Sequence, residues 1–560
     1  MLNAVNHKQV WGIGMVMATL FLAHSISFAS SPNSALVQKN DEALQGDLDN
    51  QMMDASNRWH GGIGDYMNMY HARETALMLQ RSAAAYYSPE SKFYKSAALL
   101  ERMRLAAQFL ERTQTADGNV DLLVTNFNSP PDTGFVVHYV VTVAKLAQMH
   151  DDEAVANIVK PFLVKAGAGM AKGGVHTPNH RWVVSAALAQ IHDVFPNSAY
   201  VERIDQWLAE GVDIDEEGQY SERSTGVYNA VCDYAFITMA HKLKRPELLE
   251  PVRKNLDAMS YLLHPNGEVV TVFSKRQDHN TRRTMSGYWF SLRYMAIHDQ
   301  NGVYASMLKP LEPSSMNLAE LMEYPELNKP LPDLKPIPDD YHHEYPRSGI
   351  IRIRRGKKSS NILGNGSSVW LEMRSGDAVI NGVRFASAFF GKGQFAPTGW
   401  EKRNGAYYFT QKLHGPYWQP ITDSERLPIL QDDMRRIKMS RRVSEVCKLV
   451  YEGRVRETAD GFEIDIEAKG TDNVPWALEI NFRPGGKLEG VEPVSHTEDA
   501  YVLKGDVATY TVGDSSIEFG PGAVEHTYVE LRGAEEKLSG PSVYLTGYTP
   551  CKQTLTFTFK

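Results

Sequence analysis

The spacing of apolar residues changes once along the chain, and this change limits the possible folds more than any other feature. Before residue 310 apolar residues recur at helical spacing. After residue 346 they alternate with polar residues, as strands with one buried face require. The helical segments cover residues 94–113, 136–149, 153–166, 179–195, 200–210, 224–243 and 246–263, and the alternating runs include 349–353, 368–373, 462–466 and 554–559. The sequence therefore predicts an all-helical half followed by an antiparallel β half.

Eight prolines between residues 309 and 346 separate the two patterns. Because proline has no backbone N–H and clashes with the preceding turn, such a density of prolines stops helices and marks a linker. We expect an α domain over residues 30–310, a proline-rich linker over 311–346 and a β domain over 347–560. One proline, Pro161, lies inside the helical segment 153–166 and is expected to kink or break it.

Short glycine turns recur between the helical segments, at Gly118, Gly218 and Gly267. Similar reversals between successive helices are typical of helical hairpins, although the intervals here are too uneven for a strict repeat. We therefore predict an (α/α) toroid of helical hairpins. For the alternating runs that follow, an antiparallel β-sandwich is the most economical arrangement.

The first 29 residues have the pattern of an export signal: Lys8, an apolar run over 11–23, and small residues ending at Ala29. We expect cleavage after Ala29 and a periplasmic or secreted protein. No later run is apolar for the roughly 20 residues needed to cross a bilayer, so we expect no membrane insertion. The net charge of −8 argues against bulk electrostatic binding of nucleic acid.

The composition, with 42% hydrophobic and 22% charged residues, is that of an ordinary globular protein. The cysteines, Cys232, Cys447 and Cys551, are too few for a disulfide framework. Three buried thiols are favoured over a single bridge from Cys447 to Cys551. No phosphate-binding glycine loop, dinucleotide fingerprint or Cys-x-x-Cys pair is present, so we expect no cofactor. His342 and His343 are adjacent on the linker and do not point to one centre, so we expect no metal site.

A helix that begins near Thr177 carries polar groups in its first turn. Thr177 suits the N-cap and Pro178 the first helical position, which places Asn179 and His180 in the first turn. Free backbone N–H groups and the positive end of the helix dipole lie there, so this position favours a carboxylate. His180 lies four residues before Val184 and shares the face of the apolar stripe. The simpler alternative is a capping Asn179 and a His180 packed in the core.

A second polar segment joins the Gly218 turn to the start of the next helical segment. It contains Tyr220, Glu222, Arg223 and Tyr228. A tyrosine can donate or accept a proton when a neighbouring cation lowers its pKa, and Arg223 is close enough in sequence to act on Tyr228. Aromatic packing of Tyr228 beside an exposed Glu222–Arg223 pair is the structural alternative.

Together, Asn179-His180 at one helix start and the glycine turn followed by Tyr228 at the next resemble the heparinase II/III and alginate lyase superfamily. Its members combine an incomplete (α/α) toroid with a C-terminal antiparallel β-sandwich, in the order predicted for this chain. Residues 345–353 also resemble the entry strand of that family's sandwich. A weaker similarity is to the toroidal lyases that cut rhamnose from glucuronate in plant arabinogalactans.

The resemblance implies that an acidic polysaccharide or oligosaccharide is cleaved at O4 of a uronic acid residue by β-elimination, which leaves a 4,5-unsaturated sugar. Carried over by position, it implies that Asn179 neutralises the substrate carboxylate, that His180 acts as base or neutraliser, and that Tyr228 is the general acid and could also be the base. Further substrate contacts are expected from the neighbouring residues Arg181, Tyr220, Glu222 and Arg223.

The sequence departs from the family in the β half. In the relatives the sandwich contributes a histidine-containing loop, whereas residues 381–395 of this chain contain no histidine. His414, in a Gly-Pro turn, together with Tyr408 is the predicted replacement. A hairpin packed on the toroid by its aromatic residues is the alternative. The cluster of Lys275, Arg276, Arg282 and Arg283 could supply a positive field for an acidic sugar, or form a solvated basic loop.

The chemistry of β-elimination can be stated independently of the family. Removing the weakly acidic C5 proton becomes feasible when the neighbouring carboxylate is neutralised. Tyrosine and histidine can move the protons near neutral pH. Two alternatives stay open: a non-catalytic carbohydrate-binding protein, and a toroidal glycoside hydrolase whose carboxylate pair comes from Asp215, Glu217 and Glu222. The sequence sets neither the glycan nor the oligomeric state.

Overall fold

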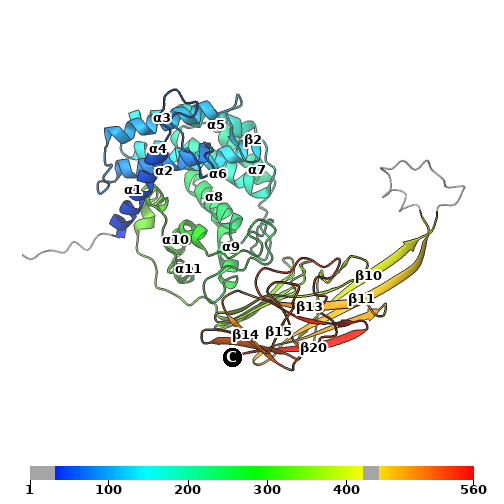
Figure 1. Cartoon of the computed structure of the whole chain (residues 1–560). Coiled ribbons are helices and arrows are strands. Elements are labelled where there is room, and N and C mark those ends of the chain that lie inside the picture. The colour runs from blue at the N-terminus through cyan, green and yellow to red at the C-terminus, as the bar shows by residue number, and fades with distance from the viewer. Residues whose placement is uncertain (1–31, 421–440) are drawn as a thin grey trace, which may run out of the picture.

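The computed structural model describes residues 32–420 and 441–560. The predicted signal peptide lies outside this range. Among the described residues, α-helices end at residue 323 and the sandwich strands begin at residue 340, so the predicted order of α before β is confirmed. Figure 1 shows the helical part and the strands as two distinct bodies joined at the start of the sandwich.

The helices of the described residues form two layers of a toroid. Helices α2, α4, α6, α8 and α10 contact one another in that order and form the inner layer, while α3, α5 and α7 contact one another outside it. The inner helix α8 is buried on most sides, whereas the outer helix α7 buries only Tyr200 and Ile204. The bounds are α1 (Pro32–Asn50), α2 (Ala72–Tyr87), α3 (Ala97–Thr113), α4 (Pro130–Met149), α5 (Glu153–Lys172), α6 (Pro178–Val194), α7 (Ser198–Ala209), α8 (Tyr228–Leu243), α9 (Glu250–Tyr261), α10 (Trp289–His298), α11 (Gly302–Leu308) and α12 (Asn317–Glu323), with a small hairpin of β1 (Val120–Leu122) and β2 (Asn126–Ser129).

The described residues of the β half form two sheets, and among the strands of these sheets only β16 and β19 pair in parallel. The first sheet has the order β15-β16-β19-β13-β7-β6-β5-β4-β3, with β8 beside β7, and the second has the order β14-β17-β18-β20-β12-β11-β10-β9. The bounds are β3 (Asp340–Tyr345), β4 (Ile350–Arg355), β5 (Lys358–Leu363), β6 (Leu371–Ser375), β7 (Ala378–Ser387), β8 (Gly393–Gln394), β9 (Glu401–Arg403), β10 (Ala406–Trp418), β11 (Val443–Glu457), β12 (Gly461–Gly470), β13 (Pro475–Phe482), β14 (Lys487–Glu489), β15 (Glu492–Pro493), β16 (Ala500–Val502), β17 (Ala508–Val512), β18 (Ser515–Gly520), β19 (Ser542–Tyr548) and β20 (Cys551–Phe559).

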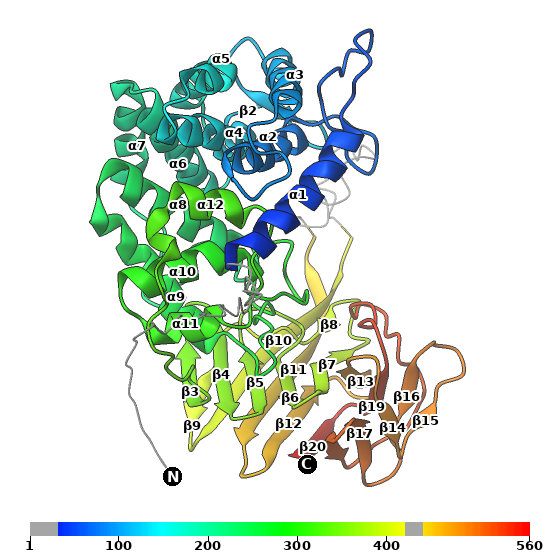
Figure 2. The ribbon, with the colours of Figure 1, turned by 90° about the vertical axis from the view of Figure 1, so that its left-hand side faces the viewer.

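The first sheet is buried on both faces because it packs between the toroid and the second sheet. Strand β4 shows this directly: Ile351 and Ile353 join the core between the two sheets, whereas Ile350 joins the core of the toroid. On the same face as Ile350, Arg352 donates hydrogen bonds to the main-chain oxygen atoms of Tyr261 and Leu263. Figure 2 shows β3 to β7 side by side beneath the helices. The toroid therefore rests on a sheet face that carries polar as well as apolar residues.

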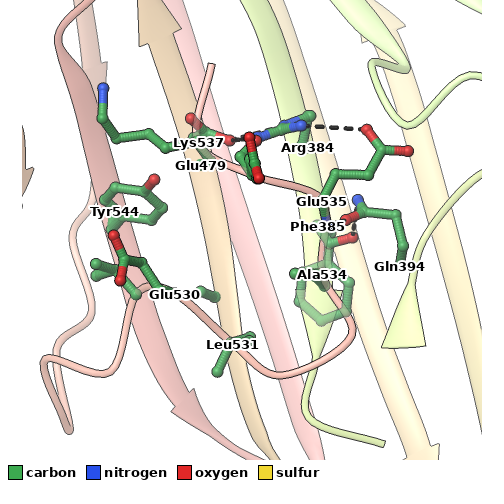
Figure 3. Close-up of a pocket in the computed structure, with 14 residues that line it drawn as sticks. Arg384, Phe385, Gln394, Glu479, Glu530, Leu531, Ala534, Glu535, Lys537 and Tyr544 are labelled. Atoms are coloured by element: carbon green, nitrogen blue, oxygen red, sulfur yellow. Dashed lines mark hydrogen bonds and ion pairs between the residues drawn. The ribbon is translucent and has the colours of Figure 1, made fainter. Parts of the chain in front are cut away.

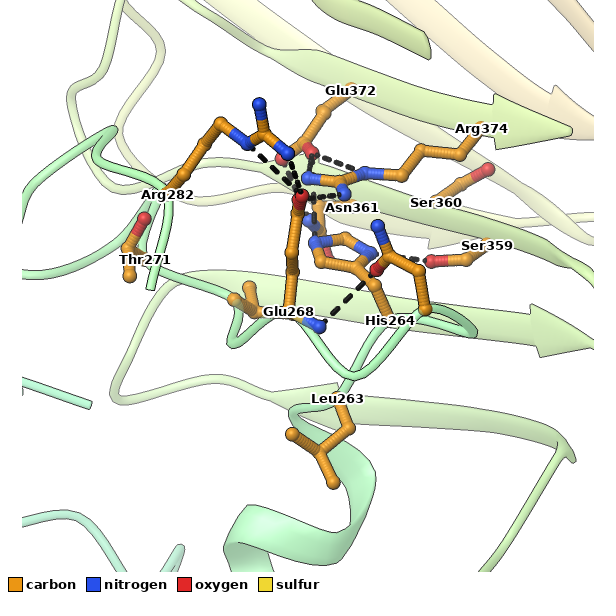
Figure 4. Close-up of polar contacts among 12 residues, drawn as sticks. Leu263, His264, Glu268, Thr271, Arg282, Ser359, Ser360, Asn361, Glu372 and Arg374 are labelled. Carbon is orange, nitrogen blue, oxygen red and sulfur yellow. Dashed lines mark hydrogen bonds and ion pairs between the residues drawn. The ribbon is translucent and has the colours of Figure 1, made fainter. Parts of the chain in front are cut away.

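A buried ion cluster joins the two halves. Glu268, in the segment after α9, accepts hydrogen bonds from two arginines of the sandwich. One comes from Arg374 at 2.5 Å (Figure 4) and the other from Arg483 at 2.9 Å. Burial opposes ionisation of Glu268, but the hydrogen bonds from Arg483 and Arg374 outweigh it and lower its pKa to about 2. Nearby, His264 of the toroid lies 2.8 Å from the hydroxyl of Ser359 on β5. These contacts fix the position of the toroid on the sandwich.

The proline-rich segment is more ordered than predicted. The predicted linker, 311–346, contains α12, a 3-10 turn at Pro325–Asn328 and the whole of β3. Pro325 occupies the first position of its turn, where a missing N–H costs nothing, so it starts a helical turn instead of stopping one. Between this turn and β3, the connection without helix or strand covers residues 329–339.

Two further sequence expectations can be compared with the structure. Helix α5 continues through Pro161, which has the buried residues Val159 and Phe162 on either side. The cysteines are free thiols: Cys232 is buried, while Cys447 and Cys551 are half-buried. None of the described helices combines the length and the apolar character needed to cross a bilayer.

Candidate functional site

The helix starts singled out in the sequence lie close together in the toroid. Helix α6 begins with Pro178 after Thr177 as its N-cap, as predicted, and this places Asn179 and His180 in the first turn. Helix α8 begins at Tyr228, after the loop that carries Glu222. A third segment, between α9 and α10, completes the group.

Glu222 occupies the start of α6. Its Oε1 accepts hydrogen bonds from the backbone N–H of Asn179 at 3.1 Å and from the side-chain Nδ2 of Asn179 at 2.6 Å. The Nδ2 group of Asn179 also donates to the hydroxyl of Thr177 at 3.2 Å. A carboxylate is stabilised at this helix start, as the sequence predicts, but it belongs to the protein.

This arrangement changes the roles expected for Asn179 and Glu222. Asn179 is only 1% exposed, and both of its amide hydrogens are used within the protein. It therefore offers no free donor to a substrate carboxylate, contrary to the role implied by the resemblance. Glu222 is buried as well and holds the start of α6 to the loop before α8, so it is a positioning residue and not a sugar contact.

Arg276 links Glu222 to Tyr228. Its Nε lies 3.4 Å from Oε2 of Glu222, and its guanidinium carbon lies 4.9 Å from the centre of the Tyr228 ring. Both Arg276 and Tyr228 are half-buried, so each keeps part of its surface open. The sequence identified Arg276 only as one of several basic residues in a loop. The structure places its positive charge beside the tyrosine at the start of α8.

His180 lies at the edge of this group as a neutral base. Burial lowers its pKa to about 4, helped by His176 and Arg276 and opposed by Asp132. The ring makes edge-on contacts with His176, at 4.7 Å between ring centres, and with Phe135, at 6.3 Å. Within the described part of the chain, Nδ1 of His180 has no hydrogen-bond partner. At neutral pH the imidazole is therefore uncharged and able to accept a proton.

Asp278 holds the second and third segments together. Its Oδ1 accepts hydrogen bonds from the hydroxyls of Ser224 at 2.8 Å and Ser274 at 2.5 Å, and its Oδ2 accepts one from the backbone N–H of Gly226 at 2.8 Å. The hydroxyl of Ser224 in turn accepts from the backbone N–H of Tyr228 at 3.0 Å. This network explains why α8 begins at Tyr228, four residues later than predicted.

Two cavities adjoin the cluster. One, of about 580 Å³, lies in the toroid and is lined by aromatic residues, including Phe135 and Trp289, and by Arg283. Gly226 and Val227, which precede Tyr228, also line it. The other, of about 540 Å³, lies between the toroid and the sandwich. Its lining includes Arg223 and Lys275, the sequence neighbours of Glu222 and Arg276, so both cavities lie beside the cluster.

Two residues predicted as substrate contacts have polar groups that already bind other residues of the protein. Tyr220 is 1% exposed, and its hydroxyl donates to the carboxylate of Asp233 at 3.0 Å in the core of the toroid. Arg181 pairs with Glu210 at 3.0 Å and with Asp213 at 3.1 Å. Arg223, by contrast, lines the cavity between the two halves, as expected of a substrate contact.

The two sandwich candidates lie on the second sheet. Tyr408 is half-buried beneath the guanidinium of Arg403, at 4.4 Å from the ring centre, and His414 is exposed on β10 opposite Lys448 of β11. Because β10 pairs with β11 along its length, the two strands form an arm that extends beyond the rest of the sandwich (Figure 1). His414 therefore lies on the arm and does not join the cluster around Tyr228, and neither does Tyr408.

The run without a histidine, 381–395, lines a separate cavity of about 500 Å³ on the sandwich (Figure 3). Arg384 fills part of it and pairs with Glu479 and Glu535. Among the described residues no ion pair involves Glu530, Glu536 or Lys537, which also line this cavity, but none of these residues belongs to the cluster around Tyr228. In the described ranges, no three histidine, cysteine or carboxylate side chains gather as metal ligands would.

The carboxylates proposed for glycoside hydrolysis are also occupied. Asp215 accepts from the backbone N–H groups of Glu217 and Gln219, both at 3.0 Å, within the glycine turn. Glu217 accepts from the backbone N–H groups of Arg347 and Ser348 on the sandwich. With Glu222 bound to Asn179, the three acids do not form an open pair, so the hydrolase alternative loses its candidate residues.

Comparison with known proteins gives matches in structure alone. No family model and no curated protein sequence matches the chain. The chondroitin AC lyase of Streptomyces coelicolor A3, solved in complex with chondroitin sulphate, is 12% identical, with a TM-score of 0.53 over 95% of this chain and 80% of that one. A Paenibacillus xanthan lyase is 11% identical, with a TM-score of 0.54 over 94% of this chain and 57% of that one. These matches confirm the predicted fold, a helical toroid followed by a β-sandwich, in the form found in polysaccharide lyases.

Proposed function

We propose that the protein is a polysaccharide lyase that cleaves at O4 of a uronic acid residue by β-elimination and leaves a 4,5-unsaturated sugar. The observation that carries this proposal is the grouping of Tyr228, Arg276 and a neutral His180, whose neighbours in the chain line two cavities. A phenol, a guanidinium and an imidazole supply the groups that elimination requires. The fold, which this chain shares with solved polysaccharide lyases, supports the same reaction class.

The reaction assigns a separate task to each group. The guanidinium of Arg276 neutralises the substrate carboxylate, which makes the C5 proton more acidic, so Arg276 takes the role first expected of Asn179. His180 or Tyr228 removes the C5 proton, the electrons form the C4–C5 double bond, and the bond from C4 to O4 breaks. Tyr228 protonates the departing O4. Glu222 and Asp278 touch neither substrate nor proton but hold these groups in place.

An acidic polysaccharide or oligosaccharide is the proposed substrate. Unpaired cations near the cluster attract negative charge in a protein whose overall charge is −8. Glycans that contain uronic acids or sulfated sugars, including chondroitin-type chains, heparan-type chains, alginate and plant gums with terminal glucuronate, are the first candidates. Rhamnose-glucuronate linkages belong to the same panel. We further propose that the protein is periplasmic or secreted, which N-terminal sequencing of the mature protein would test at Ala29.

The formation of a conjugated double bond tests the proposal. Purified protein is incubated with each glycan, and ultraviolet absorbance is followed with time. We expect turnover on at least one of them and a loss of at least about 100-fold in Tyr228→Phe, because general acid–base groups contribute about that much or more. Tyr66→Phe, at a tyrosine that is 92% exposed, is the matched control and should keep full activity.

The same experiment separates the remaining alternative. A non-catalytic carbohydrate-binding protein would bind one of these glycans without forming the double bond, and Tyr228→Phe would change nothing measurable. Equal rates for Tyr228→Phe and the natural protein would remove Tyr228 from the reaction. A saturated product would exclude elimination.

A further inference from the structure

The cavity between the two halves is rich in positive charge. Of the residues that line it, Arg223, Lys275 and Arg347 are cations, and Glu535 alone is a carboxylate. The toroid supplies Arg223 and Lys275, and the sandwich supplies Arg347 and Glu535. The cavity therefore exists only when the two halves are packed together.

The charges in this cavity are unevenly paired. Glu535 accepts a hydrogen bond from Ser368 and pairs with Arg384, and Arg347 pairs with Glu216 at the exposed rim. Arg223 and Lys275 have no carboxylate partner anywhere in the described residues. The positive charge of Arg223 lowers the pKa of Lys275, and burial of Lys275 adds to this effect. Two unpaired cations close together raise the free energy of the empty protein, and a bound anion would lower it.

The backbone around these two cations is held in place. Arg223 adopts a left-handed backbone conformation, with φ of 51°, which is uncommon for a residue with a side chain. The buried carboxylate of Asp278 then ties Ser224 and Gly226, which follow Arg223, to Ser274, which precedes Lys275. The backbone that carries the two cations therefore needs little further ordering when a ligand binds.

Each unpaired cation lies next in sequence to a member of the cluster around Tyr228. Arg223 follows Glu222, and Lys275 precedes Arg276. Because consecutive Cα atoms are about 3.8 Å apart, the cations can reach only a sugar close to the one that reacts. Arg276 faces Tyr228 while Lys275 and Arg223 line the cavity, so the two sets of cations serve different groups on the ligand.

We propose that this cavity is a subsite for a second anionic group, a carboxylate or a sulfate ester, on the sugar next to the cleaved uronate. Arg223 and Lys275 bind that group, and Arg276 binds the carboxylate of the reacting sugar. The inference rests on the proposed lyase function and narrows its substrate to chains that carry negative charge on adjacent sugars. Uronates flanked by neutral sugars would leave both cations unpaired.

The first test compares two oligosaccharides that share the cleaved uronate and differ in the neighbouring sugar. In one, that sugar carries a carboxylate or, in a parallel arm, a sulfate; in the other it is neutral. In the double variant Arg223→Gln/Lys275→Gln we expect kcat/KM to fall at least about tenfold on the anionic oligosaccharide and to change less than about twofold on the neutral one. The arm with the larger loss identifies the preferred anion. Lys254→Gln, at an exposed lysine on α9, is the control for the lost charge and should match the natural protein.

Equal losses on the anionic and neutral oligosaccharides, or no loss on either, would overturn the subsite. A second test measures binding alone, by calorimetry, with Tyr228→Phe protein and the same oligosaccharides. If no glycan is cleaved but the double substitution still weakens binding of the anionic oligosaccharide about tenfold, the lyase function fails and the subsite stands. If cleavage occurs and the double substitution leaves binding unchanged, the subsite fails and the lyase function stands.

Discussion

Glu222 is the residue whose role differs most from the expectation. Its carboxylate holds Asn179 and lies beside Arg276, so replacing it with glutamine removes two charge-assisted contacts while keeping the shape of the side chain. We expect Glu222→Gln to lower kcat at least about tenfold and the free energy of unfolding by about 1–3 kcal/mol. Steady-state kinetics and thermal unfolding measure the two effects. Glu210→Gln, at an exposed carboxylate that pairs with Arg181, should change neither by much. Equal behaviour of the two variants would contradict the positioning role.

His180 makes a specific contribution to the dependence of stability on pH. Its pKa is about 4 in the folded protein, mainly because of burial, and about 6.5 when exposed. The unfolded chain therefore binds a proton first as the pH falls, so the stabilisation is complete above pH 6.5 and is lost between pH 6.5 and about 4. We expect His180→Gln to show a weaker loss of stability over this range. Denaturation at a series of pH values measures it, and parallel pH curves for the two proteins would show that His180 is not buried as a neutral base.

The catalytic candidates could be found from sequence only as far as local signals reach. Thr177 and Pro178 define a helix start, and this places Asn179 and His180 correctly. The partner of Asn179 is Glu222, 43 residues further along, and nothing in the spacing of residues indicates their contact. The same holds for Arg276 beside Tyr228. Tyr220 and Arg181 were predicted as substrate contacts because they neighbour the catalytic candidates in the sequence. Their partners, Asp233 and the acids near α7, belong to other elements, so the sequence did not reveal them.

At the scale of elements, the glycine turns differ in how closely they pack against the neighbouring helices. Gly218 has a positive φ of 73°, and a Cβ atom there would lie 2.3 Å from the main-chain oxygen of Lys254 on α9. Gly267 has a similar φ of 80° but open space around it. We expect Gly218→Ala to lower the free energy of unfolding by about 2–4 kcal/mol and Gly267→Ala by about 1 kcal/mol. Chemical denaturation measures the free energy of unfolding of both variants. Equal losses would show that the positive φ alone, without packing, determines the destabilisation.

The elements themselves were largely predictable because their signals are local. The helical spacing between residues 94 and 263 and the alternation after residue 346 correspond to helices and strands in the structure. The proline-rich segment was the main error, since a proline at the start of a turn, such as Pro325, has the opposite effect to one inside a helix. The burial of both faces of the first sheet depends on the toroid above it and could not be read from β4 alone.

At the scale of the whole molecule, Glu268 determines whether the two halves act as one unit. It binds Arg374 and Arg483 of the sandwich, and removing its charge leaves Arg483 without a carboxylate partner among the described residues and Arg374 with Glu372 alone. We expect Glu268→Gln to lower the free energy of unfolding by about 3–5 kcal/mol. Differential scanning calorimetry should then show two separate transitions. Glu492→Gln, in an exposed pair with Lys504, is the control, and a single unshifted transition for Glu268→Gln would contradict the role of this cluster.

The position of Glu268 also gives a pH dependence of its own. Because its folded pKa is about 2, below the ordinary value of 4.5, its contribution is complete above pH 4.5 and is lost as the pH falls towards 2. The cavity that contains Arg223 and Lys275 lies at the same boundary between the halves, so we expect loss of the Glu268 contacts to weaken binding of anionic oligosaccharides as well.

The masses of the products formed in water enriched in oxygen-18 test the proposed elimination most directly. Elimination predicts that the fragment with the new unsaturated end is lighter by one water than the same fragment from hydrolysis and contains no oxygen-18. A saturated product that has taken up oxygen-18 from the solvent would contradict it.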